Sequence, residues 1–157
     1  MVLFVLVPFF ACKKDDPDPA PCSGGDLEMT LNSEQVTAIS FNNTLLMGGS
    51  TGRRMDIRAT DADGRQLTIT FTDLFTNSGN CVSTNEYIPF DDITTGTENT
   101  FLFTITQDGV SESFIDGSLD ITSCDANARK VSGTFSFSFG DTDVTNGTFT
   151  DVCYTII

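Results

Sequence analysis

The sequence predicts an all-β protein, and two observations lead to this class. Apolar and polar residues alternate along many short segments, and residues typical of tight turns separate these segments. No stretch shows a convincing helical period, and we expect at most one helical turn, near Ser33-Glu34-Gln35. The spacing of the segments indicates about eight to ten strands. This predicts a single antiparallel β-sandwich or an up-and-down β-barrel.

Four segments show the alternation most clearly. Residues 66–72 place three apolar side chains on one face and threonines on the other, and residues 101–106, 118–122 and 134–139 repeat the pattern. Threonine is β-branched and suits the solvated face of a sheet. Most of the fourteen phenylalanines occupy such alternating positions. We therefore interpret them as core packing.

Turn residues connect the predicted strands. Asp63-Gly64 predicts a hairpin with a type I′ turn, and Asn42-Asn43 and Asp108-Gly109 show the same pattern less strongly. Residues 140–143 should turn the Phe-rich strand back onto the C-terminal segment. A hairpin at Asn146-Gly147 would leave too short a strand before it, so we predict a β-bulge there.

The N-terminus has the features of a bacterial lipoprotein signal. Residues 1–11 are nearly all apolar, which matches the core of a signal peptide and is too short for a membrane span. A small residue, Ala11, precedes Cys12, so cleavage would leave Cys12 as the lipid-bearing N-terminus. No Lys or Arg precedes the apolar run, as expected if the true start lies upstream. An ordinary signal peptide and a buried strand are the alternatives.

The residues after Cys12 carry a first resemblance. Lys13, Lys14, Asp15 and Asp16 resemble the signal that sends lipoproteins of Bacteroidota to the cell surface, which implies the exterior of the outer membrane. Residues 15–25 alternate proline with small and acidic residues, a composition that cannot bury a core, and with residues 12–14 they form one segment, 12–25. We expect this segment to be a flexible tether, followed by an all-β domain over residues 26–157.

A second resemblance lies near the C-terminus. The segments SGTFSF (132–137) and NGTF (146–149), with Leu119, Ile121 and Asp125 ahead of them, resemble the C-terminal signature of Bacteroidota surface lipoproteins of unknown function. The likeness would cover residues 36–154 and is specific over roughly the last 40. It implies a small all-β domain on the cell envelope. It brings no substrate and no catalytic residue.

The cysteine count predicts two disulfides. Once Cys12 is set aside, Cys22, Cys81, Cys124 and Cys153 remain, an even number for an oxidising compartment, and three pairings are open. We favour Cys81–Cys124, because turn-like residues flank both, and Cys22–Cys153, because domain termini are often close. The wide spacing and the lack of histidine argue against a metal site.

The composition excludes several functions. The net charge is −14, with 22 acidic and 8 basic residues, so nucleic acid would be repelled and is not an expected partner. We attribute the acidity to solubility. The chain has no histidine, which removes the commonest general base and the Ser-His-Asp and Cys-His systems. We expect no enzyme activity, no cofactor and no metal.

Several groups of carboxylates could form a site, but turns and loops account for them better. Asp91-Asp92 is the most concentrated pair, but neighbours on a strand face opposite ways, so a solvated loop explains it better than a glycosidase. Residues 61–64 (Asp-Ala-Asp-Gly) and 141–143 (Asp-Thr-Asp) could supply oxygens to calcium. Turns select the same residues, and we favour turns.

Tyrosines that could bind a sugar and arginines that could bind an anion are the remaining binding candidates. A sugar platform needs exposed aromatic faces, and outside the phenylalanines only Tyr87 and Tyr154 are available. Arg53, Arg54 and Arg58 form the only basic cluster of the domain, and we expect them to pair with carboxylates rather than grip an anion.

These observations predict a lipid-anchored, cell-envelope protein that binds a protein or a glycan without catalysis or serves a structural role. Its membrane partner would be reached through the lipid on Cys12. The alternative is a lipocalin-like barrel that carries a small apolar ligand between phenylalanine-rich faces.

Overall fold

The computed structural model of the protein describes residues 22–42, 44–49, 52–74, 80–90, 99–114 and 116–157. Within these ranges there are twelve β-strands and no α-helix, so the predicted all-β class is confirmed. The strands are β1 (Asp26–Leu31), β2 (Glu34–Phe41), β3 (Leu45–Gly49), β4 (Gly52–Asp61), β5 (Gln66–Asp73), β6 (Glu86–Pro89), β7 (Thr100–Gln107), β8 (Val110–Phe114), β9 (Asp116–Asp125), β10 (Lys130–Phe139), β11 (Thr142–Cys153) and β12 (Thr155–Ile156). The count exceeds the predicted eight to ten because β3, β6, β8 and β12 have at most five residues. So short a segment shows too little alternation to be recognised.

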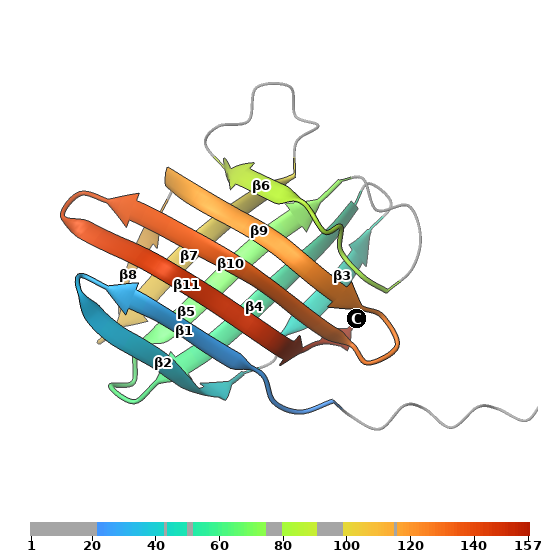
Figure 1. Ribbon diagram of the computed structural model, residues 1–157, viewed down its shortest axis with the longest axis horizontal. Helices are drawn as coiled ribbons and strands as arrows, with labels where there is room; N and C mark the ends of the chain where they lie inside the picture. The colour runs from blue at the N-terminus through green and yellow to red at the C-terminus, as the bar shows by residue number, and fades with distance from the viewer. Residues whose placement is uncertain (1–21, 43, 50–51, 75–79, 91–98, 115) are drawn as a thin grey trace, which may run out of the picture.

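The strands form two facing layers (Figure 1). The front layer runs β2-β1-β11-β10-β9-β6, and the back layer contains β12, β3, β4, β5, β7 and β8. Strand β2 pairs first with β1 and then with β4, and β6 pairs first with β9 and then with β7. Strand β4 also pairs with β5, so the strand order closes on itself and the sheet is ring-like. The two halves of this ring are the two layers. This arrangement is consistent with both predicted architectures. Apart from β12–β3 and β6–β7, the pairs are antiparallel.

Two predicted turns are confirmed, with one difference in type. Asp108-Gly109 joins β7 to β8 with φ of 53° and 80°, the left-handed pair that a type I′ turn requires. Asp63-Gly64 joins β4 to β5, but of these two only Gly64 is left-handed, with φ of 80°. The expected type I′ geometry is therefore wrong at this turn. Asn43 lies outside the described residues.

The helical turn expected near Ser33-Glu34-Gln35 is wrong. Asn32 and Ser33 form a two-residue hairpin turn with φ of 47° and 72°, and Glu34 and Gln35 already belong to β2. Asn tolerates the left-handed region because its short side chain can bond locally. Here the Asn32 side chain accepts a hydrogen bond from the N–H of Asp143 at 2.8 Å. This bond fixes the turn against β11.

The predicted bulge in the long C-terminal strand is confirmed. Phe135 pairs with Gly147 and Phe137 with Val144, so β11 uses one residue more than β10 between these pairs. Asn146 adopts φ of 51° at this point. A bulge of this kind increases the local twist of the strand.

Phenylalanine rings fill the space between the layers. The rings of Phe103 from the back layer and Phe137 from the front layer stack at 4.4 Å between centroids. Phe101 lies 5.3 Å from Phe137, and Phe135 lies 5.7 Å from Phe103. These four side chains are at most 3% exposed. The interpretation of the alternating phenylalanines as core packing is confirmed for them.

The two disulfides are those predicted. Cys22 is bonded to Cys153 and Cys81 to Cys124, with Cα atoms 5.5 and 5.8 Å apart. The carbonyl of Gly24 also accepts a hydrogen bond from the N–H of Cys153 at 3.1 Å. Residues 22–25, the end of the predicted tether, are therefore attached to β11.

Several sequence-based predictions fall outside the described residues. These are the leader 1–11, the lipidation site Cys12, the export residues Lys13, Lys14, Asp15 and Asp16, and the pair Asp91-Asp92. Over the part of the chain that is described, no helix has the length and apolar character needed to cross a membrane.

Candidate functional site

Four hairpin turns meet at one end of the two layers. They join β1 to β2, β4 to β5, β7 to β8 and β10 to β11, and the space between them is a pocket of about 510 Å³. Its volume exceeds those of four other pockets on the described residues, which range from about 190 to about 410 Å³. We call it the end pocket. It is lined by Leu31, Asn32, Glu34, Arg65, Ile105, Gln107, Asp108, Val110, Glu112 and Thr142.

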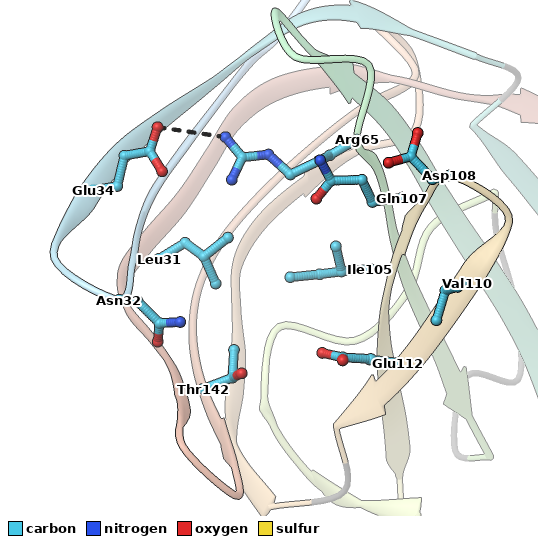
Figure 2. Close-up of a pocket in the computed structure, with 10 residues that line it drawn as sticks. All are labelled: Leu31, Asn32, Glu34, Arg65, Ile105, Gln107, Asp108, Val110, Glu112 and Thr142. Carbon is cyan, nitrogen blue, oxygen red and sulfur yellow. Dashed lines mark ion pairs between the residues drawn. The ribbon is translucent and has the colours of Figure 1, made fainter.

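The end pocket has an apolar floor. Figure 2 shows Leu31 and Ile105 facing one another across it, from β1 in the front layer and β7 in the back layer. Ile105 is only 8% exposed and belongs to the core, so the pocket reaches the edge of the space between the layers. Val110 stands at the mouth and is 66% exposed. These three side chains supply apolar surface to the lining of the pocket.

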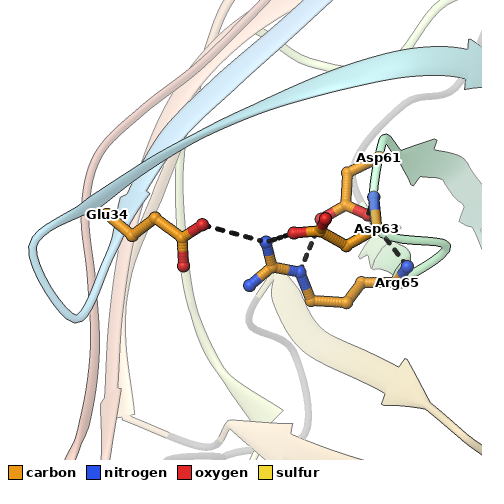
Figure 3. A network of polar contacts seen from close by, with 4 residues as sticks. All are labelled: Glu34, Asp61, Asp63 and Arg65. Carbon is orange, nitrogen blue, oxygen red and sulfur yellow. Dashed lines mark hydrogen bonds and ion pairs between the residues drawn. The ribbon is translucent and has the colours of Figure 1, made fainter.

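Arg65, the one buried cation among the described residues, forms one wall of the pocket (Figure 3). Its Nε donates to Asp61 at 2.6 Å and its Nη2 to Asp63 at 2.7 Å, and Glu34 lies 3.6 Å from the same Nη2. The Asp61 carboxylate, 3% exposed, also accepts the N–H groups of Asp63 and Arg65 at 2.9 Å each. One aspartate thus closes the β4–β5 turn and holds the guanidinium.

The charge of Arg65 is fixed by these neighbours. Burial alone would lower its pKa, but the hydrogen bond and charge of Asp61, with the charges of Glu34 and Asp63, outweigh burial and raise the pKa. Arg65 therefore keeps its positive charge, and the carboxylates of Asp61 and Asp63 offset that charge. The exposed carboxylates of Glu34, Asp108 and Glu112 remain at the lining, so the pocket carries net negative charge. In Figure 2 Glu112 points toward the side of the pocket where Thr142 lies.

The two calcium candidates are turns in this structure. The Asp61–Gly64 segment is the β4–β5 turn described above, and its oxygens serve Arg65 and the backbone. Asp141 lies in the β10–β11 turn, and Thr142 and Asp143 begin β11, where the N–H of Asp143 donates to the Asn32 side chain. Among the described residues no three or more Asp, Glu, His or Cys side chains are grouped so as to hold a metal.

The arginine cluster pairs with a carboxylate, as expected, at two of its three members. Arg54 and Arg58 both donate to Asp56, at 2.9 and 3.2 Å. The two tyrosines considered as a sugar platform are buried instead. The Tyr87 hydroxyl donates to the carbonyl of Ser83, and the Tyr154 hydroxyl donates to the carbonyl of Asn80. Both therefore brace the segment around Cys81.

Sequence reasoning did not find the residues of the end pocket. Leu31, Glu34, Arg65 and Glu112 come from three different hairpins, and no local motif links them. The sequence signals were limited to the predicted turns at Asp63-Gly64, Asp108-Gly109 and 140–143, which lie beside Arg65 or contain Asp108 and Thr142. The end pocket forms only because these turns lie at the same end of the fold, and that placement is a property of the tertiary structure.

The carrier alternative stays a prediction. The stacked rings of Phe103, Phe135 and Phe137 occupy the space between the layers, where such a ligand would lie. No observation on the described residues favours it over the end pocket.

No protein-family model matches this chain, and neither a curated protein nor a solved structure shows significant similarity to it. The resemblance to Bacteroidota surface lipoproteins therefore remains a prediction, and function has to be argued from the geometry.

Proposed function

We propose that this chain is a lipid-anchored protein of the outer membrane, facing the cell exterior, that binds a partner protein through the end pocket without catalysis. The observation that carries the binding role is the composition of the end pocket. An apolar floor made by Leu31 and Ile105 lies between the carboxylates of Glu34 and Glu112. This combination selects a ligand with an alkyl stem and a positive end.

A lysine or arginine side chain of a partner protein has this form. Its methylene stem packs on apolar surface while its charged head reaches polar groups. In the end pocket the stem would contact Leu31 and Ile105, and the head would lie among the three lining carboxylates. Arg65 does not oppose such a ligand, because Asp61 and Asp63 already offset its charge at 2.6 and 2.7 Å.

The position of the pocket suits an anchored protein. Cys22, where the described chain begins, is bonded to Cys153 at one end of β11, and Thr142 at the other end of β11 lines the end pocket. A strand of 12 residues spans on the order of 35 Å. A lipid on Cys12, ten residues before Cys22 in the sequence, would leave the end pocket turned away from the membrane.

The residues of the end pocket fit a protein that binds a ligand without catalysing a reaction. The chain has no histidine, and Arg65, the one cation among the lining residues, is hydrogen-bonded to Asp61 and Asp63. A binding role needs only the shape and charge described here.

The ligand class is tested by NMR titration of the full-length protein in detergent micelles. The probe is N-acetyl-lysine methylamide, and the matched control is the norleucine analogue, which keeps the stem and lacks the charge. We expect the lysine probe to shift amide signals near Ile105 and Glu112, and the norleucine analogue to bind at least tenfold more weakly. In Glu34→Gln/Glu112→Gln the lysine probe should cause no shift, and its advantage over norleucine should be lost. Equal binding of the two probes, or no shift at millimolar lysine probe, would overturn the ligand assignment.

The anchor is tested separately. Labelled palmitate should enter the wild-type protein and not the Cys12→Ala variant, and protease added to intact cells should release the domain. Unlabelled wild-type protein, or complete protection from protease, would contradict the proposed location.

A further inference from the structure

The outer face of the back layer, on the side of β4 and β5 that points away from the core, carries a second polar surface. Alternation along β4 turns Met55, Ile57 and Ala59 into the core, so Arg54, Asp56 and Arg58 face outward. In the neighbouring strand these three lie opposite Thr72, Thr70 and Thr68. We call these six outward residues the arginine face.

Asp56 organises the arginine face. Although it lies on the outer side of the sheet, its side chain is only 3% exposed. It accepts hydrogen bonds from Arg54 at 2.9 Å, Arg58 at 3.2 Å and the Thr70 hydroxyl at 3.0 Å. One carboxylate thus fixes two guanidiniums, and two positive charges against one negative charge leave the group at +1.

The two guanidiniums retain binding capacity. Their side chains are 53% and 50% exposed. An arginine has five N–H donors, and the described bonds to Asp56 use two on Arg54 and one on Arg58. Because the buried Asp56 holds them in place, they would lose little freedom on pairing with an incoming anion. A fixed positive group on a protein of net charge −14 is a local exception.

The relief of this surface suits an extended ligand. Three shallow hollows of about 280, 200 and 190 Å³ lie on it. Arg54 lines the first two and Arg58 lines the third. Thr72 and Gln66, which mark the two extremes of this series along β5, are about 20 Å apart at the usual rise of a strand.

The groups along the hollows match a sugar chain that carries carboxylates. Threonine hydroxyls and the amide of Gln66 can exchange hydrogen bonds with sugar hydroxyls, and arginine pairs with a carboxylate through two parallel bonds. Phe90, at 56% exposure, lines the same hollow as Arg54 and Thr70, and an exposed aromatic ring can pack against sugar C–H groups. We infer that the arginine face binds an acidic polysaccharide, one whose sugars include uronic acids.

The inference is independent of the end pocket. It is tested with the full-length protein and oligogalacturonate as the probe, by isothermal titration at low and high salt. A neutral galactose oligomer and poly-glutamate are the comparison ligands. We expect oligogalacturonate binding that weakens with salt, and at least tenfold weaker binding of both comparison ligands.

The test variant is Arg54→Gln/Asp56→Asn/Arg58→Gln, which removes the positive group without leaving a buried carboxylate unpaired. We expect it to lose at least tenfold in affinity, and Phe90→Ala to lose severalfold. Lys130→Gln, which removes a cation elsewhere, and Glu34→Gln/Glu112→Gln in the end pocket should bind as the wild type does. Circular dichroism would verify that each variant is folded.

Three results would overturn the inference. They are no heat with oligogalacturonate at millimolar concentration, undiminished binding by the triple variant, and equal affinity for poly-glutamate, which would point to an acidic peptide. Loss of binding in the end-pocket variant alone would also contradict it, because the carboxylates of the end pocket are not part of this face.

Discussion

Phe135 lies directly opposite Gly147 in the β10–β11 ladder, and a Cβ atom on Gly147 would come within 2.4 Å of the Phe135 ring. The relationship is reciprocal. Gly133 lies opposite Phe149, and a Cβ there would approach that ring to 2.5 Å. The repeated Gly-Thr-Phe sequence is therefore a packing motif, in which each strand supplies a ring and leaves room for the ring of its neighbour.

Replacing Gly147 should be costly. In Gly147→Ala the new methyl group meets the Phe135 ring and backbone, and overpacking of this kind costs about 1–3 kcal/mol in the free energy of unfolding. Gly48→Ala is the matched control, because Gly48 is also a strand glycine and nothing lies within 4 Å of its Cβ position. Urea unfolding should give a lower midpoint for Gly147→Ala only. Equal midpoints would contradict the packing role.

Much of the fold could be predicted because strand alternation and turn residues are local signals. The bulge near Asn146 and the Asp108-Gly109 turn are examples, and so are the disulfides, because four cysteines allow few pairings. The exchange of β2 between the layers could not be predicted. In β2, Thr37 is the last residue that pairs with β1, and from Ala38 to Phe41 the strand pairs with β4 instead. That choice is made by tertiary contacts.

The end pocket could not be predicted from the sequence, because tertiary contacts also bring its residues together. Glu34 and Arg65 are 31 positions apart, and they meet only because two turns lie at the same end of the fold. Asp56 gave no signal either. The sequence shows its neighbours Arg54 and Arg58 as part of a basic cluster. The burial of Asp56, however, follows from the packing of the outer face.

Both tyrosines should resist ionisation while the protein is folded. Burial, followed by the charge of Asp73, raises the pKa of Tyr87, and burial, followed by Asp125, raises the pKa of Tyr154. The folded form therefore holds these protons more tightly than the unfolded form, whose tyrosine pKa is about 10. Stability from this source is complete below pH 10 and is lost as the pH rises above it.

The measurement is direct, because the chain has two tyrosines and no tryptophan. Absorbance at 295 nm should rise near pH 10 in urea and at a higher pH in the native protein. Urea midpoints should fall above pH 10. A reversible native titration near pH 10 would show that the hydroxyls are exposed to solvent.

The ion pair of Arg65 should contribute to stability more than an exposed pair does. Arg65→Gln leaves the Asp61 carboxylate, 3% exposed, with only its two backbone donors. Breaking a buried pair can cost about 3–5 kcal/mol, and these donors should limit the loss to roughly 2–3 kcal/mol. A double-mutant cycle with Asp61→Asn should give a coupling energy above about 1 kcal/mol.

The exposed pair Lys130–Asp151, at 3.3 Å, is the control. Its side chains are well solvated, so Lys130→Gln should change the free energy of unfolding by no more than about 0.5 kcal/mol. Similar losses for the two variants would mean that the Arg65 network adds nothing beyond an ordinary surface pair.

Removing the Cys22–Cys153 bridge should destabilise the protein mainly through the unfolded chain. The bridge closes a loop of 131 residues, against 43 for Cys81–Cys124. Loop entropy puts the upper bounds near about 5 and about 4 kcal/mol, and measured losses are commonly about 2–4 kcal/mol. Cys22→Ala/Cys153→Ala should therefore unfold at a clearly lower urea concentration than the wild type, and slightly lower than Cys81→Ala/Cys124→Ala.

Replacing both cysteines of a bridge avoids a free thiol that could exchange with the other pair. Alkylation before and after reduction, followed by intact-mass analysis, should show that Cys22, Cys81, Cys124 and Cys153 react only after reduction. If all four are alkylated in the exported protein without reduction, the bridges do not form there, and the entropic argument does not apply. If the bridges form but the Cys22→Ala/Cys153→Ala midpoint equals that of the wild type, the unfolded chain already keeps its ends together.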